Sequence, residues 1–185
     1  MSDIEFALNT MYLLFSGALV MWMAAGFTML EAGLVRSKNV SEIVTKNIGL
    51  YSIACIMYLI CGFYIMYQGD SAVNAYIPDF SFKYLGLTMG GQDKSYGSYA
   101  EASDFFFQVV FVATAMSIVS GAVAERMKLI PFFIFSIFLT GFIYPIQGYW
   151  KWGGGFLDQL GYADFAGSGV VHLCGATAAL ATVII

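Results

Sequence analysis

Five long stretches without a charged residue divide this chain of 185 residues. They cover residues 6–30, 47–69, 105–124, 129–150 and 165–185. Each stretch reaches the ~20 residues that an α-helix needs to cross the hydrocarbon core of a bilayer. We therefore predict an all-α membrane protein with five transmembrane helices in a single transmembrane domain over residues 1–185. The predicted helices span about 6–34, 47–69, 103–124, 129–150 and 164–185.

The composition agrees with a membrane protein and excludes several other classes. Charged residues make up 11% of the chain, whereas a soluble domain carries about 25%. The formal net charge of −4 argues against a nucleic-acid partner, because such a partner needs a basic surface. The three cysteines lie in apolar stretches without a Cys-x-x-Cys spacing, so we expect unreactive, buried thiols. We expect no metal, no cofactor and no enzymatic activity, because the sequence shows no metal-ligand cluster and no nucleophile–base pair.

The basic residues predict the orientation of the chain. Two connections, 31–46 and 125–128, hold Arg36, Lys38, Lys46, Arg126 and Lys128. Because Lys and Arg concentrate in cytoplasmic loops, we expect the N-terminus outside and the end of the fifth helix in the cytoplasm. Most acidic residues then lie outside, where they either concentrate a cation or simply solvate the loops. The polar connection 70–104 is too broken to span, and its fold is left open.

Two ionisable residues mark the last apolar stretch, Asp164 at its start and His172, the only histidine of the chain. In a continuous helix they would lie roughly 12 Å apart along the axis, too far for a direct contact. An ionisable side chain inside a membrane is costly and therefore predicts function. For Asp164 the alternative is a cap on the helix N-terminus, and for His172 it is a satisfied core histidine.

Aromatic residues gather near the predicted outer ends of the helices. Phe107 and Phe111 are four residues apart, so they share one helix face. Trp152 precedes a run of three glycines. Two interpretations stay open for these aromatics: a belt at the membrane interface, or ring faces that bind a cation. At the opposite end we expect Glu31 to pair with Arg36 at the cytoplasmic edge.

Four motifs resemble the ammonium transporter (Amt/Mep/Rh) family. They are MLEAGLVRSKN, GAVAERMKLIPFFIFSIF, YPIQGYWKWGGGFL and GYADFAGSGVVHLCGATAAL. The resemblance implies a fold of eleven membrane helices, built as two inverted five-helix repeats and a final helix, and a homotrimer with one pore per subunit. This chain is similar to the first repeat, the N-terminal half, and we expect it to be a fragment of the whole.

The resemblance also implies roles for individual residues. Phe107 and Trp152 look like the outer aromatics that hold ammonium, and Asp164 is similar to the aspartate that supports this recruitment site. Phe111, beneath Phe107, looks like part of the stacked-phenylalanine gate. His172 looks like the first of two pore histidines that relay a proton.

The expected function is transport of ammonium or ammonia across the cell (plasma or inner) membrane by a multi-pass protein. Ammonium would be recruited, deprotonated and passed as ammonia, with methylammonium as an analogue. A cytoplasmic PII signalling protein is an expected partner. Two alternatives stay open: an ammonium sensor or receptor on the same scaffold, and a half-subunit that does not transport.

Overall fold

The computed structural model describes residues 2–67, 73–80 and 98–185, and every regular element within them is a helix. Four segments are long and apolar enough to cross a membrane: Asp3–Leu34, Ser37–Met66, Glu101–Ala122 and Leu129–Gln159. A shorter apolar helix follows over Ser168–Ile184. The predicted all-α class is confirmed. The 70–104 connection falls mostly outside the described residues.

The elements have the following bounds. The first segment is α1 (Asp3–Leu34). The second comprises the short 3₁₀-helix η1 (Ser37–Asn39), α2 (Val40–Met57), the π-helical turn η2 (Tyr58–Gly62) and α3 (Phe63–Met66). The third is α4 (Glu101–Ala122), and the fourth comprises α5 (Leu129–Phe138), the π-helical turn η5 (Leu139–Ile143), α6 (Tyr144–Trp152) and α7 (Phe156–Gln159). The last comprises the π-helix η6 (Ser168–Leu173) and α8 (Cys174–Ile184).

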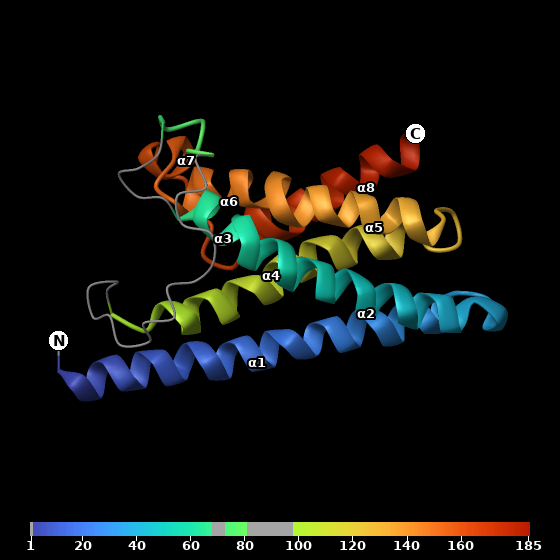
Figure 1. Cartoon of the computed structure of the whole chain (residues 1–185), viewed down its shortest axis with the longest axis horizontal. Coiled ribbons are helices and arrows are strands. Elements are labelled where there is room, and N and C mark those ends of the chain that lie inside the picture. Colours follow the sequence, from blue (N-terminus) through green and yellow to red (C-terminus); the bar gives the residue numbers. More distant parts are fainter. Residues whose placement is uncertain (1, 68–72, 81–97) are drawn as a thin grey trace.

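The long helices run alternately between two ends of the bundle (Figure 1). The N-terminus and α7 lie at one end, and the turns that follow α1 and α4 lie at the other. These two turns are joined, because the backbone N–H of Arg36 donates to Glu125 Oε1 at 2.9 Å, and Asn39 Nδ2 donates to the same atom at 2.6 Å. These bonds, together with the Arg36 guanidinium, lower the pKa of Glu125 to about 2. Two basic connections of the sequence therefore share one end of the bundle.

Local hydrogen bonding explains where α1 begins. The Ser2 hydroxyl accepts from the Glu5 N–H at 3.2 Å, and the Glu5 carboxylate accepts from the Ser2 N–H at 2.7 Å. This reciprocal capping box satisfies two donors that the first turn leaves free. The acidic side chains of Asp3 and Glu5 also suit the positive end of the helix dipole. The helix therefore starts at Asp3, inside the charged N-terminal tail rather than at the first apolar residue.

The π-helical turns η2 and η5 pack against each other where the second and fourth segments cross. Pro145 has no N–H to offer the carbonyl of Gly141, four residues earlier. That carbonyl accepts instead from the Cys61 thiol in η2, with an S···O distance of 3.4 Å. A Cβ on Gly141 would lie 2.7 Å from Met57 Cε, so a larger residue here would require the end of the Met57 side chain to move. The carbonyl that Pro145 leaves without a partner is thus satisfied at the crossing of the two segments.

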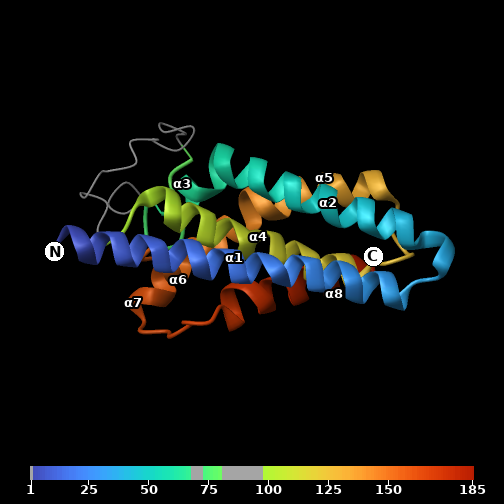
Figure 2. The ribbon, with the colours of Figure 1, turned by 90° about the horizontal axis from the view of Figure 1, so that it is seen from below.

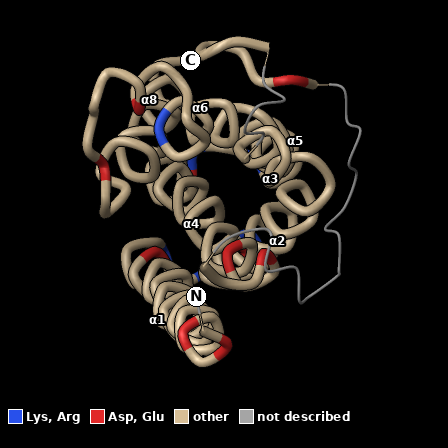
Figure 3. The backbone as a smooth tube through the Cα atoms, turned by 90° about the vertical axis from the view of Figure 1, so that its left-hand side faces the viewer, with Lys and Arg blue, Asp and Glu red and all other residues tan. Residues whose placement is uncertain are grey.

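α4 forms the centre of the bundle, and α1 lies along its side (Figures 2 and 3). Two buried clusters, around Val110 and Met116 of α4, fill the interior. On α1, by contrast, only Gly17 and Glu31 are buried. Most side chains of the first helix are therefore at least partly exposed on the outside of the bundle.

The expected ion pair between Glu31 and Arg36 is wrong. Glu31 is 3% exposed and accepts from Lys46 Nζ of α2 at 3.3 Å. Its Oε2 atom also accepts from the Ser120 hydroxyl of α4 at 2.8 Å and from Asn47 Nδ2 at 3.3 Å. Arg36 pairs with Glu125 instead, at 3.0 Å. The helix turns Glu31 toward the bundle, whereas Arg36 lies beyond the helix end and reaches the α4–α5 turn.

Candidate functional site

Asp164 lies before the last helix and holds its first turn in place. The residue is 5% exposed, and its Oδ2 atom accepts from the backbone N–H groups of Gly169 at 2.9 Å and Val170 at 2.7 Å. Amide groups at a helix start lack partners within the helix, and a carboxylate there also suits the helix dipole. The geometry agrees with the capping interpretation of Asp164.

The chain must fold back sharply between Asp164 and η6 for this contact. Gly167 permits the turn with φ of +80°, a conformation that favours glycine. The helix consequently begins at Ser168, four residues after the expected start. A Cβ on Gly167 would lie 2.6 Å from Val171 Cγ2, so a larger residue would also meet η6.

Trp152, the last residue of α6, is joined to the same turn. Its indole Nε1–H donates to the backbone carbonyl of Asp164 at 3.0 Å. One turn and a half earlier, Gln147 Nε2 donates to the carbonyl of Gly169 at 3.1 Å. Two side chains of α6 therefore hold the backbone on both sides of this turn, at Asp164 and at Gly169.

The two phenylalanines form a pair on α4. The ring centroids of Phe107 and Phe111 lie 5.0 Å apart with an interplanar angle of 82°, an edge-to-face contact. Both rings are half-buried. Phe111 and Trp152 pack against one buried cluster that includes Val170 and Val171 of η6. The structure thus brings Trp152 together with Asp164 and Phe107 together with Phe111, and it connects the two pairs through η6.

His172 lies on η6 and is exposed in this chain. Its backbone N–H donates to the carbonyl of Gly167 at 3.0 Å, the five-residue spacing of a π-helix. The expected 12 Å spacing from Asp164 assumed one continuous helix, and residues 165–167 are not helical. Two exposed apolar neighbours, Leu173 and Leu180, accompany the imidazole. The histidine therefore lies on a surface that the described residues leave uncovered.

Sequence reasoning missed two polar features near these residues. Gln147 is a polar residue in the fourth apolar stretch, and its position there could have marked it. The buried pair of Glu31 and Lys46 was also missed, although both residues lie in the charged stretch 31–46 between the first two apolar stretches. Among the described residues, no three His, Cys, Asp or Glu side chains cluster closely enough to hold a metal ion.

Four helices that are long and apolar enough to cross a membrane define a multi-pass α-helical membrane protein. The chain belongs to the Ammonium Transporter Family, whose family model matches residues 11–185.

Individual relatives agree with this assignment. A protein of Synechocystis sp. (strain ATCC 27184 / PCC 6803 / Kazusa), provisionally named an ammonium transporter, is 41% identical over 184 residues, covering 100% of this chain and 40% of the relative. Ammonium transporter Amt2 of Archaeoglobus fulgidus is 38% identical over 191 residues, covering 98% of this chain and 39% of the relative. The chain therefore spans about two fifths of the length of these relatives.

A solved structure shares the fold. The protein named "Sensor Amt Protein" superimposes with a TM-score of 0.80 at 35% sequence identity, over 95% of this chain and 43% of that chain. The expected resemblance to the ammonium transporter family is thus confirmed.

Proposed function

We propose that this chain supplies the first five-helix repeat of an ammonium transporter, with the N-terminus outside and the apolar helix Ser168–Ile184 as the fifth crossing. Family membership supports the substrate, since the family and its relatives carry ammonium transport in their names. The observation that carries the proposal is the joint placement of Trp152 and Asp164, an aromatic face fixed to the backbone of a buried carboxylate.

Ammonium would be recruited by aromatic faces and a nearby negative charge. A cation over an aromatic ring gains roughly 0.5–2 kcal/mol, and Phe107 and Trp152 are the proposed rings. Asp164 contributes through its charge and through the turn that it holds, because its Oδ2 atom already accepts two backbone N–H groups. It supports the site and does not contact the ion.

Passage beyond the aromatic rings would require loss of the proton. Moving an unpaired ammonium ion into a low-dielectric interior costs several kcal/mol even after relaxation, more than two aromatic faces return. Neutral ammonia avoids this cost, whereas potassium has no proton to lose. Phe111, with Phe107 above it, would form the gate, and the ring nitrogens of His172 would accept or relay the proton.

The test is uptake of labelled methylammonium by the intact protein in cells that lack their own ammonium transporters. Saturable uptake that ammonium inhibits and potassium does not is expected. His172→Ala should lower the maximal rate about tenfold or more, whereas Leu173→Ala, an exposed neighbour on the same helix, should leave it near wild type. Wild-type rate and selectivity in His172→Ala would contradict the relay role.

A sensor on the same scaffold is the second candidate, because the solved structure named "Sensor Amt Protein" is 35% identical over 95% of this chain. A sensor would bind ammonium at the same residues without needing net uptake. Ammonium would then raise the melting temperature of the purified protein while uptake stays at background. Saturable uptake by the wild type would exclude a pure sensor.

The proposal extends to assembly and location. We expect a homotrimer in the cell membrane and contact with a cytoplasmic PII signalling protein. Native mass spectrometry of the detergent-solubilised protein tests the trimer, and co-purification with PII tests the partner. An N-terminal tag accessible from outside intact cells tests the orientation.

A further inference from the structure

Gly17 of the first helix lies in close contact with α4 near the proposed recruitment site. Gly17, one of two buried residues on α1, faces the start of α4. A Cβ built on Gly17 would lie 2.8 Å from Cδ1 and Cε1 of the Phe106 ring and 3.3 Å from the backbone Cα of Phe107. Real Cβ atoms essentially never lie within 3.0 Å of another heavy atom, so a side chain here would require the Phe106 ring or the nearby backbone of α4 to shift.

The part of α4 that faces Gly17 carries one of the proposed ammonium-binding rings. Phe107 follows Phe106 directly, and its Cα itself lies within the contact range of Gly17. The Phe107 ring in turn meets Phe111 edge to face at 5.0 Å. A shift of the backbone at Phe107 would therefore move both proposed rings, although neither ring touches Gly17.

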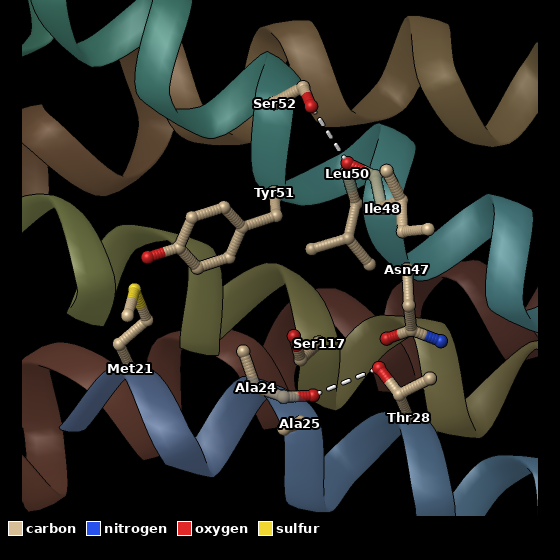
Figure 4. A pocket seen from close by; sticks show the side chains of 10 residues that line it. All are labelled: Met21, Ala24, Ala25, Thr28, Asn47, Ile48, Leu50, Tyr51, Ser52 and Ser117. Carbon is tan, nitrogen blue, oxygen red and sulfur yellow. Dashed lines mark hydrogen bonds between the residues drawn. The ribbon is translucent and has the colours of Figure 1, made fainter. Parts of the chain in front are cut away.

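Before Gly17, Asn9 Nδ2 donates to the Ser98 carbonyl at 3.1 Å and the Thr10 hydroxyl accepts from the Ala100 N–H at 3.0 Å, which joins α1 to the residues just before α4. Further along, a cavity of about 270 Å³ separates α1 from α2 (Figure 4). Its α1 wall is formed by Met21, Ala24, Ala25 and Thr28, and the facing wall by residues of α2 that include Asn47 and Tyr51. The next buried contact of α1 is Glu31, at the opposite end of the helix. Between these hydrogen bonds and the cavity, Gly17 is the buried residue of α1 that approaches the part of α4 with the aromatic rings.

We propose that Gly17 is a positioning residue for Phe107: the absence of a side chain lets α1 and α4 approach closely enough to hold the ring where ammonium is recruited. This inference rests on the proposed function. Although α1 contributes no residue to the proposed site, it would then control the affinity for the substrate.

Gly17→Ala tests the proposal, with Gly26→Ala as the matched control. Both changes add one methyl group to the same helix and remove the same glycine penalty, about 1 kcal/mol. A Cβ on Gly26 meets nothing within 4 Å. In methylammonium uptake, Gly17→Ala should raise the half-saturation concentration about threefold to tenfold, the range for one weakened cation–π contact. The maximal rate per copy should change less, and Gly26→Ala should match the wild type.

A rescue experiment tests whether the contact with the Phe106 ring causes the effect of Gly17→Ala. Phe106→Ala removes the ring atoms that the new methyl group would meet, so Gly17→Ala/Phe106→Ala should have a lower half-saturation concentration than Gly17→Ala alone. Half-saturation does not depend on copy number, so a modest fall in abundance does not obscure the result. Equal values for Gly17→Ala and Gly26→Ala, absence of rescue, or complete loss of Gly17→Ala from the membrane would each overturn the proposal.

The same experiments distinguish a failure of the proposed transport function from a failure of the positioning role of Gly17. If the wild type shows no saturable uptake, the transport proposal fails, whatever the Gly17 variants do. If the wild type transports and Gly17→Ala keeps the wild-type half-saturation concentration, only the positioning role fails.

Discussion

Two buried carboxylates stabilise the bundle in different ways. Glu31 pairs with the cation Lys46 of α2. It also accepts hydrogen bonds from the side chains of Asn47 of α2 and Ser120 of α4. Asp164 is bound by the backbone N–H groups of Gly169 and Val170. None of the ion pairs among the described residues includes Asp164.

The two carboxylates differ in how their charge is compensated. The charge of Glu31 is compensated by Lys46, whose Nζ also donates to the Ser120 carbonyl at 2.9 Å and lies 5.1 Å from the Phe132 ring centroid. Among the described residues, the Asp164 carboxylate accepts from backbone N–H groups and takes part in none of the ion pairs. We infer that the Glu31 pair fastens α1 to the bundle, whereas Asp164 serves the site.

The largest expected effect comes from breaking the Glu31 pair. Lys46→Met leaves a buried, uncompensated carboxylate and should lower the free energy of unfolding by about 3–5 kcal/mol. Melting temperature in detergent measures this, and Lys38→Met, which removes an exposed lysine, is the control. Adding Glu31→Gln to Lys46→Met should restore most of the stability. A stable Lys46→Met protein would show that the pair does not fasten α1.

A smaller effect is expected at Trp152. Trp152→Phe keeps an aromatic face but loses the N–H that donates to the Asp164 carbonyl. A lost hydrogen bond of about 1 kcal/mol corresponds to roughly fivefold weaker recruitment, measured as a higher half-saturation concentration for methylammonium. Trp152→Leu, which loses the face as well, should be weaker still. If both variants match the wild type, Trp152 does not take part in recruitment.

The smallest effect is expected at the surface carboxylate Glu125. Its pKa in the folded protein is about 2, against an ordinary 4.5, so its bonds to Arg36 and Asn39 stabilise the fold above pH 4.5. This stability is lost as the pH falls from 4.5 toward 2, because protonation removes the charge. The difference in melting temperature between wild type and Glu125→Gln should therefore be greatest near neutral pH and vanish near pH 2. A difference that is independent of pH would contradict this assignment. High salt should reduce it, since the pair is exposed.

The same two carboxylates show what a single sequence can predict. The apolar stretches located the helices because membrane insertion depends on local hydropathy, which each stretch contains in full. The charged residues did not mark the helix ends. The second helix was expected from residue 47, but α2 begins at Val40 and includes Lys46. A lysine can lie within the bundle when it pairs with a buried carboxylate. The partner of Glu31 could not be predicted, because Lys46 and Ser120 come from other helices.

The local geometry at Asp164 was only partly predictable. A carboxylate before an apolar run indicated a cap, and the amide bonds to Gly169 and Val170 agree with it. The π-helical turn and the left-handed Gly167 were not predictable. They depend on α6, whose Trp152 and Gln147 hold the turn from outside its own sequence.

The most direct test of the central claim is Asp164→Asn in the intact protein, with methylammonium uptake and melting temperature measured on the same preparation. The amide oxygen of asparagine can still accept from Gly169 or Val170, so only the charge is lost. The account predicts uptake reduced about tenfold, equivalent to ~1.4 kcal/mol, with a melting temperature close to that of the wild type. Wild-type uptake in Asp164→Asn, or a large loss of stability that accounts for the reduced uptake, would contradict it.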